Sequence, residues 1–189
     1  IKNINLVDLK SSEYLYIEGY LVTSDVAMEA VHQSIEFSSK NDVKIALTFS
    51  DLAMVKYFKD NFKSILNNKV DLLFCNEDEA KTFSGSDTLE DSIKYLVKLS
   101  STLVVTLGKN GSLIYHNGEK ITIDPYPTKA VDTVGAGDTY AGAFLYGITN
   151  GLSLKKSGEL ASLLSSKVVS KIGPRLEKDD ILSNKNFFK

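Results

Sequence analysis

The sequence contains little of the residue types that mark disulfide-rich domains, metal clusters or membrane segments. Among its 189 residues there are one cysteine, Cys75, only two histidines and no tryptophan. A single cysteine excludes a disulfide framework within the chain and a cysteine-rich metal or redox motif. No apolar run approaches the roughly 20 residues that a membrane-spanning helix needs. Because no signal or transit peptide is recognisable either, we expect a cytoplasmic protein that does not interact with membranes.

The chain also lacks a strong excess of charge of either sign. Its 22 basic residues nearly balance its 24 acidic ones, which gives a formal net charge of −2, and the lysines are scattered. This pattern argues against a nucleic-acid-binding surface. The hydrophobic content of 43% is ample for one buried core, and the length fits one domain or part of a larger one. Since the chain starts with Ile1 and its first 20 residues have the pattern of a domain interior, we expect 1–189 to be one α/β domain that is part of a larger one.

Apolar, strand-like stretches alternate along the chain with segments of helical periodicity. Asn-Gly pairs at 110–111 and 117–118 bracket "SLIYH" and predict a hairpin. The other strands are apolar throughout, which is typical of a parallel sheet covered on both faces. Ligands bind such sheets at the carboxyl ends of the strands, so the turns after Phe74, Thr106 and Val131 are candidate sites. The patterns predict strands at 13–21, 43–49, 70–75 and 101–108, and helices at 24–40, 51–68, 88–100, 138–148 and 151–173.

The stretch "DTVGAGDTYAGAFLYG" at 132–147 places a glycine-rich turn before an apolar helix. Small residues and the unpaired N–H groups of a first helical turn form an anion site. The motif is not Walker A, because no Lys-Ser/Thr follows, and Tyr140 replaces the third glycine of the dinucleotide fingerprint. In one interpretation Asp138 caps the helix; in the other it accepts the proton of an attacking hydroxyl during phosphoryl transfer. Asp132 is better placed to cap the turn or to bind a cation.

The segment "DTVGAGD" resembles the C-terminal signature of the ribokinase-like (PfkB) family of carbohydrate and nucleoside kinases. In the expected order, "NEDEA" at 76–80 resembles the family's Asn-x-x-Glu element, and "VVTLGKNGSLI" at 104–114 resembles its ATP-side strand and turn. "YIEGYL" and "SKIGPRL" most resemble the adenosine-kinase-like branch. The resemblance implies a three-layer α/β/α fold with a mostly parallel sheet. It also implies that this chain is the C-terminal nucleotide-binding and catalytic portion of a larger kinase domain, with the N-terminal part and the lid missing.

Residue roles follow from the resemblance by position. Asp138 matches the catalytic base, and Asp132 and Thr133 match a loop that binds a monovalent cation. The family's anion hole for the transferring phosphoryl group matches Gly135, Ala136 and Gly137.

Two further elements match the nucleotide side of the family site. Asn76 and Glu79 match the element that positions the phosphates and, through water, Mg²⁺; from the residues alone, an Asn N-cap with a Glu capping box is the simpler interpretation. Thr106, Gly108 and Gly111 match the nucleotide-side turn, where an ordinary hairpin is the alternative. The helix at 155–171 and "KIGPRL" are expected to line the adenine side.

Together these features predict an ATP-dependent phosphotransferase. It would move the γ-phosphate to a hydroxymethyl group of a sugar or of a nucleoside such as adenosine, with ATP and Mg²⁺ as cofactors and K⁺ as a further candidate. The alternatives are a catalytically silent nucleotide-binding module, against which the intact Asp138 argues, and a vitamin kinase of the hydroxymethylpyrimidine or pyridoxal type. Since the family's lid often forms a dimer interface, a homodimer of the full-length protein is compatible with the resemblance.

Overall fold

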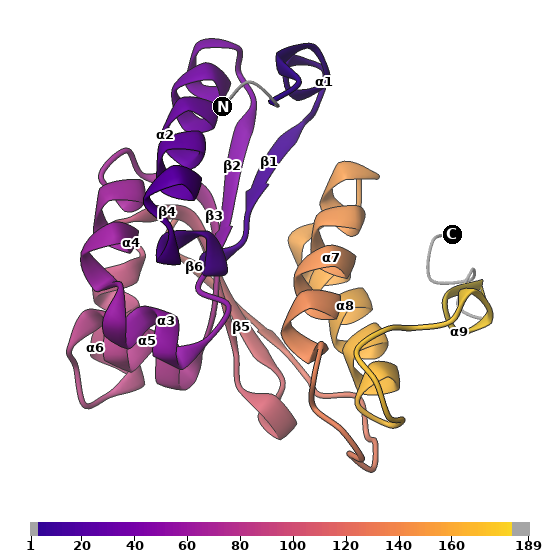
Figure 1. Ribbon diagram of the computed structural model, residues 1–189. Coiled ribbons are helices and arrows are strands. Elements are labelled where there is room, and N and C mark those ends of the chain that lie inside the picture. Colours follow the sequence, from indigo (N-terminus) through magenta and orange to yellow (C-terminus); the bar gives the residue numbers. More distant parts are fainter. Residues whose placement is uncertain (1–3, 183–189) are drawn as a thin grey trace. The chain divides into compact units, whose positions relative to one another are not determined.

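The computed structural model describes residues 4–182, and it divides into two compact units (Figure 1). Unit 1 runs to Val105 and includes Tyr115–Glu119, whereas unit 2 consists of Thr106–Ile114 and the residues from Lys120 onward. The division passes through a hairpin rather than a linker, and the prediction of one domain stays a prediction.

A six-stranded sheet has the strand order β1-β2-β3-β4-β5-β6. The β1–β2 and β2–β3 pairs are parallel, with Leu47 of β2 opposite Leu73 of β3. The predicted hairpin is confirmed: Asn117 and Gly118 have φ angles of 49° and 81°, as a two-residue type I′ turn requires. The strands are β1 (Tyr14–Ile17), β2 (Lys44–Thr48), β3 (Val70–Asn76), β4 (Ser100–Thr106), β5 (Ser112–His116) and β6 (Glu119–Ile123).

The helices predicted in unit 1 occur in the predicted order with shorter bounds, and α1 is a helix that the patterns do not predict. Ser24 caps α2 by accepting the amide of Ala27, and a 3-10 helix at Gly19–Thr23 replaces the end of the strand predicted at 13–21. The single helix predicted at 51–68 is wrong, because Phe58 leaves the helical conformation and divides it into two short helices. The helices are α1 (Leu6–Lys10), α2 (Asp25–Lys40), α3 (Leu52–Tyr57), α4 (Lys59–Leu66), α5 (Glu77–Ser84) and α6 (Leu89–Leu96).

Three phenylalanines form the centre of the core of unit 1. The ring centroid of Phe49, at the end of β2, lies 5.0 Å from that of Phe62 in α4 and 4.7 Å from that of Phe83 in α5. All three side chains are at most 1% exposed. Aromatic contacts of this kind stabilise a core beyond the burial of area alone. They join the carboxyl end of β2 to α4 and α5.

Unit 2 contains α7 (Ala136–Thr149), α8 (Leu154–Val168) and α9 (Lys178–Leu182). Small residues bring α7 and α8 close together, since a Cβ on Gly147 would lie only 2.5 Å from Ser157 Oγ. Tyr140 of α7 is buried and shares a hydrogen bond of 2.6 Å with Ser112 of β5. Tyr146, on the same helix, is 49% exposed. No helix in the described part of the chain is long and apolar enough to cross a membrane.

The packing of α7 on α8 leaves one hydroxyl unsatisfied. Ser157 Oγ is buried and has no hydrogen-bond partner within residues 4–182, so we expect Ser157→Ala to raise the free energy of unfolding by about 1 kcal/mol. Ser162→Ala is the matched control, because Ser162 Oγ donates to the carbonyl of Asp124 at 3.0 Å, and it should lower that free energy by about 1 kcal/mol. Urea denaturation measures both. Equal destabilisation by the two variants would contradict the assignment of Ser157 Oγ as a buried hydroxyl without a hydrogen bond.

Candidate active site

The turn before α7 is held by hydrogen bonds from both sides. The N–H of Val131 donates to the carbonyl of Val169 at 2.7 Å. The carboxylate of Asp132 accepts the N–H of Val134 at 3.0 Å and that of Gly173 at 3.1 Å. These two bonds, the first more than the second, hold the pKa of Asp132 below its ordinary value. Asp132 therefore caps the turn, one of its two predicted roles, and its role toward a monovalent cation stays a prediction.

Gly135 is the N-cap residue of α7 and adopts the left-handed conformation, with φ 79° and ψ 1°. A Cβ at this position would lie 2.4 Å from the carbonyl oxygen of Pro174. Both the backbone conformation and the lack of space therefore require glycine. Because α7 begins at Ala136, two residues before the predicted start, the interpretation of Asp138 as the helix cap is wrong; Asp138 is the third residue of the helix.

The first turn of α7 presents N–H groups that have no acceptor. The N–H of Ala136 donates to the carbonyl of Thr133 at 3.2 Å. The N–H groups of Gly135, Gly137 and Asp138 donate to no residue that the structure describes. A Cβ on Gly137 would meet nothing within 4 Å, so a ligand can approach this backbone. Free donors at the start of a 14-residue helix are an anion-binding arrangement.

A cavity of about 560 Å³, the first cavity, opens beside this turn within unit 2. Its volume lies within the range of about 300–1,000 Å³ that is typical of small-molecule and cofactor sites. Its wall is formed by residues far apart in the sequence, among them Lys109 and Tyr140. It brings together six residues predicted for the site: Thr106, Gly108, Gly111, Thr133, Ala136 and Gly137.

The two glycines of the nucleotide-side turn differ in what requires them. Gly111 has a φ of 83°, and a Cβ there would lie 2.1 Å from the carbonyl oxygen of Ile123 in β6. The fold therefore needs this glycine. Gly108 has a φ of 57° but open space around it. Its lack of a side chain leaves room at the wall of the first cavity.

The wall of the first cavity includes a loop that no motif in the sequence indicates, at 125–130. The one available signal is "PYP" at 125–127, where two prolines stiffen the chain. Helix α8 contributes three serines to the wall of this cavity: Ser162, Ser165 and Ser166. Ser165 Oγ donates to the carbonyl of Ala136 at 3.1 Å, and Ser162 Oγ donates to that of Asp124 at 3.0 Å. The helix predicted to line the adenine side thus lines this cavity and also fixes its walls. The segment "KIGPRL", predicted for the same side, does not line it; Pro174, Arg175 and Leu176 line another cavity of unit 2.

Asp138 lines a different space, a second cavity of about 640 Å³ within unit 2. Its side chain is exposed and forms no hydrogen bond or ion pair with any described residue. Ala136 and Gly137 line the first cavity, whereas Asp138 and Thr139 line the second, so the first turn of α7 borders both. A carboxylate without a partner is able to accept a proton from a hydroxyl that lies within hydrogen-bond reach.

In unit 1, Asn76 and Glu79 form the capping box of α5. The carboxylate of Glu79 accepts the backbone N–H and the side-chain amide of Asn76, both at 2.8 Å. In return, Asn76 Oδ1 accepts the N–H of Glu79 at 2.9 Å. The capping interpretation is therefore confirmed.

Because both carboxylate oxygens of Glu79 are engaged and its side chain is only 5% exposed, the pair Asn76 and Glu79 fits contact with Mg²⁺ through water better than direct ligation. No group of three or more His, Cys, Asp or Glu side chains suited to a metal ion occurs between residues 4 and 182. The roles of Asn76 and Glu79 toward Mg²⁺ and phosphates stay predictions.

Burial gives Glu79 a pH dependence that can be measured. Desolvation raises its pKa to about 7, against the hydrogen bond from the Asn76 backbone, which lowers it. Between the ordinary pKa of about 4.5 and 7, the folded state binds more protons than the unfolded state. Stability should therefore fall as pH rises through this window, by up to about 3 kcal/mol. Denaturant unfolding in EDTA at several pH values should show this fall for the wild type, and Glu79→Gln should reduce its slope. An equal slope for both proteins would assign the pH dependence to other groups.

Comparison with known protein families shows a match to the pfkB family of carbohydrate kinases over residues 2–180. The ATP-dependent 6-phosphofructokinase of Thermoanaerobacterium thermosaccharolyticum is 34% identical over 185 residues, which cover 95% of this chain and 57% of that protein. The ribokinase of Lactococcus lactis is 37% identical over 138 residues, covering 66% of this chain and 45% of that protein. The chain therefore spans about half the length of the curated relatives it matches.

A solved structure agrees with these matches. The adenosine kinase from Sinorhizobium meliloti superimposes with a TM-score of 0.93 at 27% identity, covering 98% of this chain and 57% of that one. This likeness confirms the predicted fold class, the three-layer α/β/α fold with a mostly parallel sheet. The match of the family model over nearly the whole chain and the relative at 34% identity lead to one conclusion: the chain belongs to the pfkB family of carbohydrate kinases.

Proposed function

We propose that the protein transfers the γ-phosphate of ATP to a hydroxymethyl group of a sugar or nucleoside. One observation carries the proposal: among residues 4–182, the carboxylate of Asp138 and the N–H groups of Gly135 and Gly137, all at the start of α7, have no hydrogen-bond partner. Phosphoryl transfer needs donors for the negative charge and a base for the hydroxyl. Relatives named as a 6-phosphofructokinase and a ribokinase favour a sugar acceptor, and the neighbour named as an adenosine kinase keeps a nucleoside as a candidate.

In this proposal ATP occupies the first cavity and the acceptor occupies the second. The acceptor hydroxyl gives its proton to Asp138 while its oxygen forms a bond to the γ-phosphorus. The bond from that phosphorus to the bridging oxygen of the β-phosphate breaks, and ADP leaves with the electron pair. The amides of Gly135 and Gly137 stabilise the charge on the equatorial oxygens. Asn76 and Glu79 stay the predicted positioning residues for Mg²⁺, which would neutralise phosphate charge when bound.

The base is tested by Asp138→Asn, which keeps the shape of the side chain and removes its ability to take the proton. We expect phosphoryl transfer from ATP to fall by about 10²–10⁴-fold, with little change in ATP affinity. Turnover is measured against a panel of sugars and nucleosides.

Asp179→Asn is the matched control, because Asp179 is exposed on α9 and lines neither cavity. Full activity of Asp138→Asn would disprove the base assignment. ATP binding without transfer to any acceptor by the wild type would favour the silent nucleotide-binding module.

The anion site is tested by a pair of glycines in α7. Neither Gly137 nor Gly142 has an atom within 4 Å of an added Cβ, so alanine should keep or raise stability at both, by up to about 1 kcal/mol. Gly137→Ala, at the wall of the first cavity, should weaken ATP binding about tenfold, because the methyl group hinders the approach of a phosphate. Gly142→Ala should not weaken it, since Gly142 does not line that cavity. Isothermal titration calorimetry measures the affinity of both variants for ATP, and equal affinities would refute the anion site at the start of α7.

A further inference from the structure

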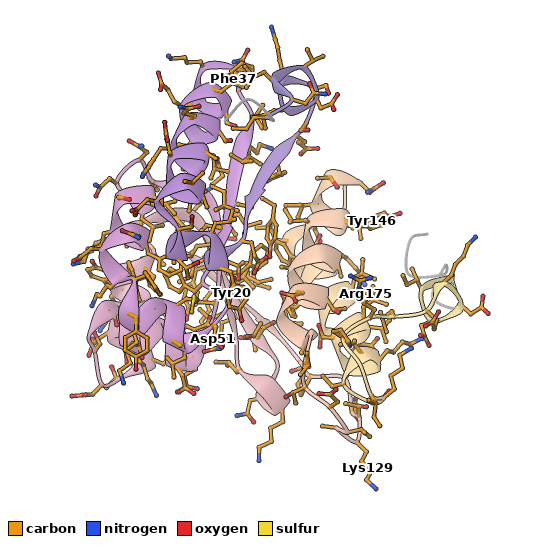
Figure 2. All side chains as sticks on the ribbon, viewed as in Figure 1. Tyr20, Phe37, Asp51, Lys129, Tyr146 and Arg175 are labelled. Carbon is orange, nitrogen blue, oxygen red and sulfur yellow. The ribbon has the colours of Figure 1, made fainter. Side chains whose placement is uncertain are left out.

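The second cavity holds two charged side chains of opposite sign in otherwise uncharged walls. Asp138 and Arg175 are its charged lining residues, and Tyr146, Leu164, Leu176 and Ile181 supply large apolar side chains. Figure 2 shows Arg175 on the segment that follows α8, with Tyr146 on α7. Apolar walls with a few polar groups that fix orientation are typical of a small-molecule site.

Arg175 is the only arginine in the sequence, and its guanidinium has no partner in the described structure. It is exposed, and no hydrogen bond or ion pair joins it to Asp138 or to any other residue within 4–182. A guanidinium presents donors in a planar fork that matches a carboxylate or a phosphate bidentately. The second cavity therefore contains an unused donor for an anion in addition to the carboxylate at the start of α7.

The backbone that carries Arg175 is anchored to the same turn. Pro174 packs against Gly135, where its carbonyl oxygen would lie 2.4 Å from a Cβ. The N–H of Gly173 donates to the Asp132 carboxylate at 3.1 Å. Arg175 thus extends from a fixed point beside the start of α7, and its long side chain can reach a molecule that occupies the second cavity.

Building on the proposed function, we propose that the acceptor carries an anionic group, a carboxylate or a phosphate, which Arg175 binds. The hydroxyl that reacts lies at Asp138 and the anionic group lies at the guanidinium. The carboxylate of Asp138 and the guanidinium of Arg175 thus bind two different parts of one substrate. If Arg175 instead paired with Asp138, the carboxylate would be a weaker proton acceptor, and no such pair is present.

The test is equilibrium binding of three probes, fructose, fructose 6-phosphate and gluconate, to the wild type, Arg175→Met and Lys178→Met, without ATP. We expect the wild type to bind an anionic probe about tenfold more tightly than fructose, and Arg175→Met to lose that preference. Fructose 6-phosphate and gluconate distinguish a phosphate from a carboxylate. Lys178→Met removes a positive charge from exposed Lys178, which does not line the cavity, and it should keep the preference.

Equal affinity for all three probes, or a preference that Arg175→Met retains, would overturn the inference. So would an Arg175→Met protein whose kcat falls with neutral and anionic sugars alike at unchanged KM, because the guanidinium would then act on the transferring phosphoryl group. Selective binding through Arg175 without phosphoryl transfer to any probe would support the anion site and count against the proposed function. The two proposals can therefore fail separately.

Discussion

The close approach of Gly135 to the backbone of Pro174 sets where α7 begins, and the arrangement of the site depends on that point. With no room for a Cβ and a left-handed φ, the chain ends its turn at Gly135 and starts the helix at the next residue. The hydrogen bond from Gly173 to Asp132 holds the same two segments together from the other side. Free donors and the Asp138 carboxylate are consequently presented within one helical turn.

This placement explains how a carboxylate can adjoin an anion-binding helix start. Gly137 lines the first cavity and Asp138 lines the second, so the N–H group of Gly137 and the carboxylate of Asp138 border different spaces although the two residues are consecutive in the chain. Repulsion between Asp138 and a bound phosphate is reduced where the two face different cavities. In the proposed reaction, Asp138 can therefore accept a proton from one molecule while the N–H group of Gly137 stabilises charge on another.

In unit 1, Asn76 and Glu79 have a structural role and a predicted functional one. Asn76 and Glu79 complete the first turn of α5, and the burial that this requires raises the pKa of Glu79 to about 7 although a backbone N–H hydrogen-bonds to its carboxylate. Desolvation outweighs the hydrogen bond because a carboxylate that is 5% exposed loses most of its hydration. A buried carboxyl group of this kind gains from nearby positive charge, which is compatible with the predicted role near Mg²⁺.

The sequence by itself determined the local features of this protein: the alternation of strands and helices, the hairpin at Asn117-Gly118, the Asn76–Glu79 capping box and the glycine turn before α7. Each depends on residues within a few positions of one another, and therefore on propensities and hydrogen bonds that a short stretch specifies. The start of α7 at Ala136 was not predictable in this way, because it depends on the contact of Gly135 with Pro174, a residue distant in the sequence. Only the tertiary structure brought the turn at 106–111, the loop at 125–130 and α8 to one cavity, and placed Arg175 with Asp138 at another. These contacts join segments tens of residues apart, and no local pattern encodes which of them meet.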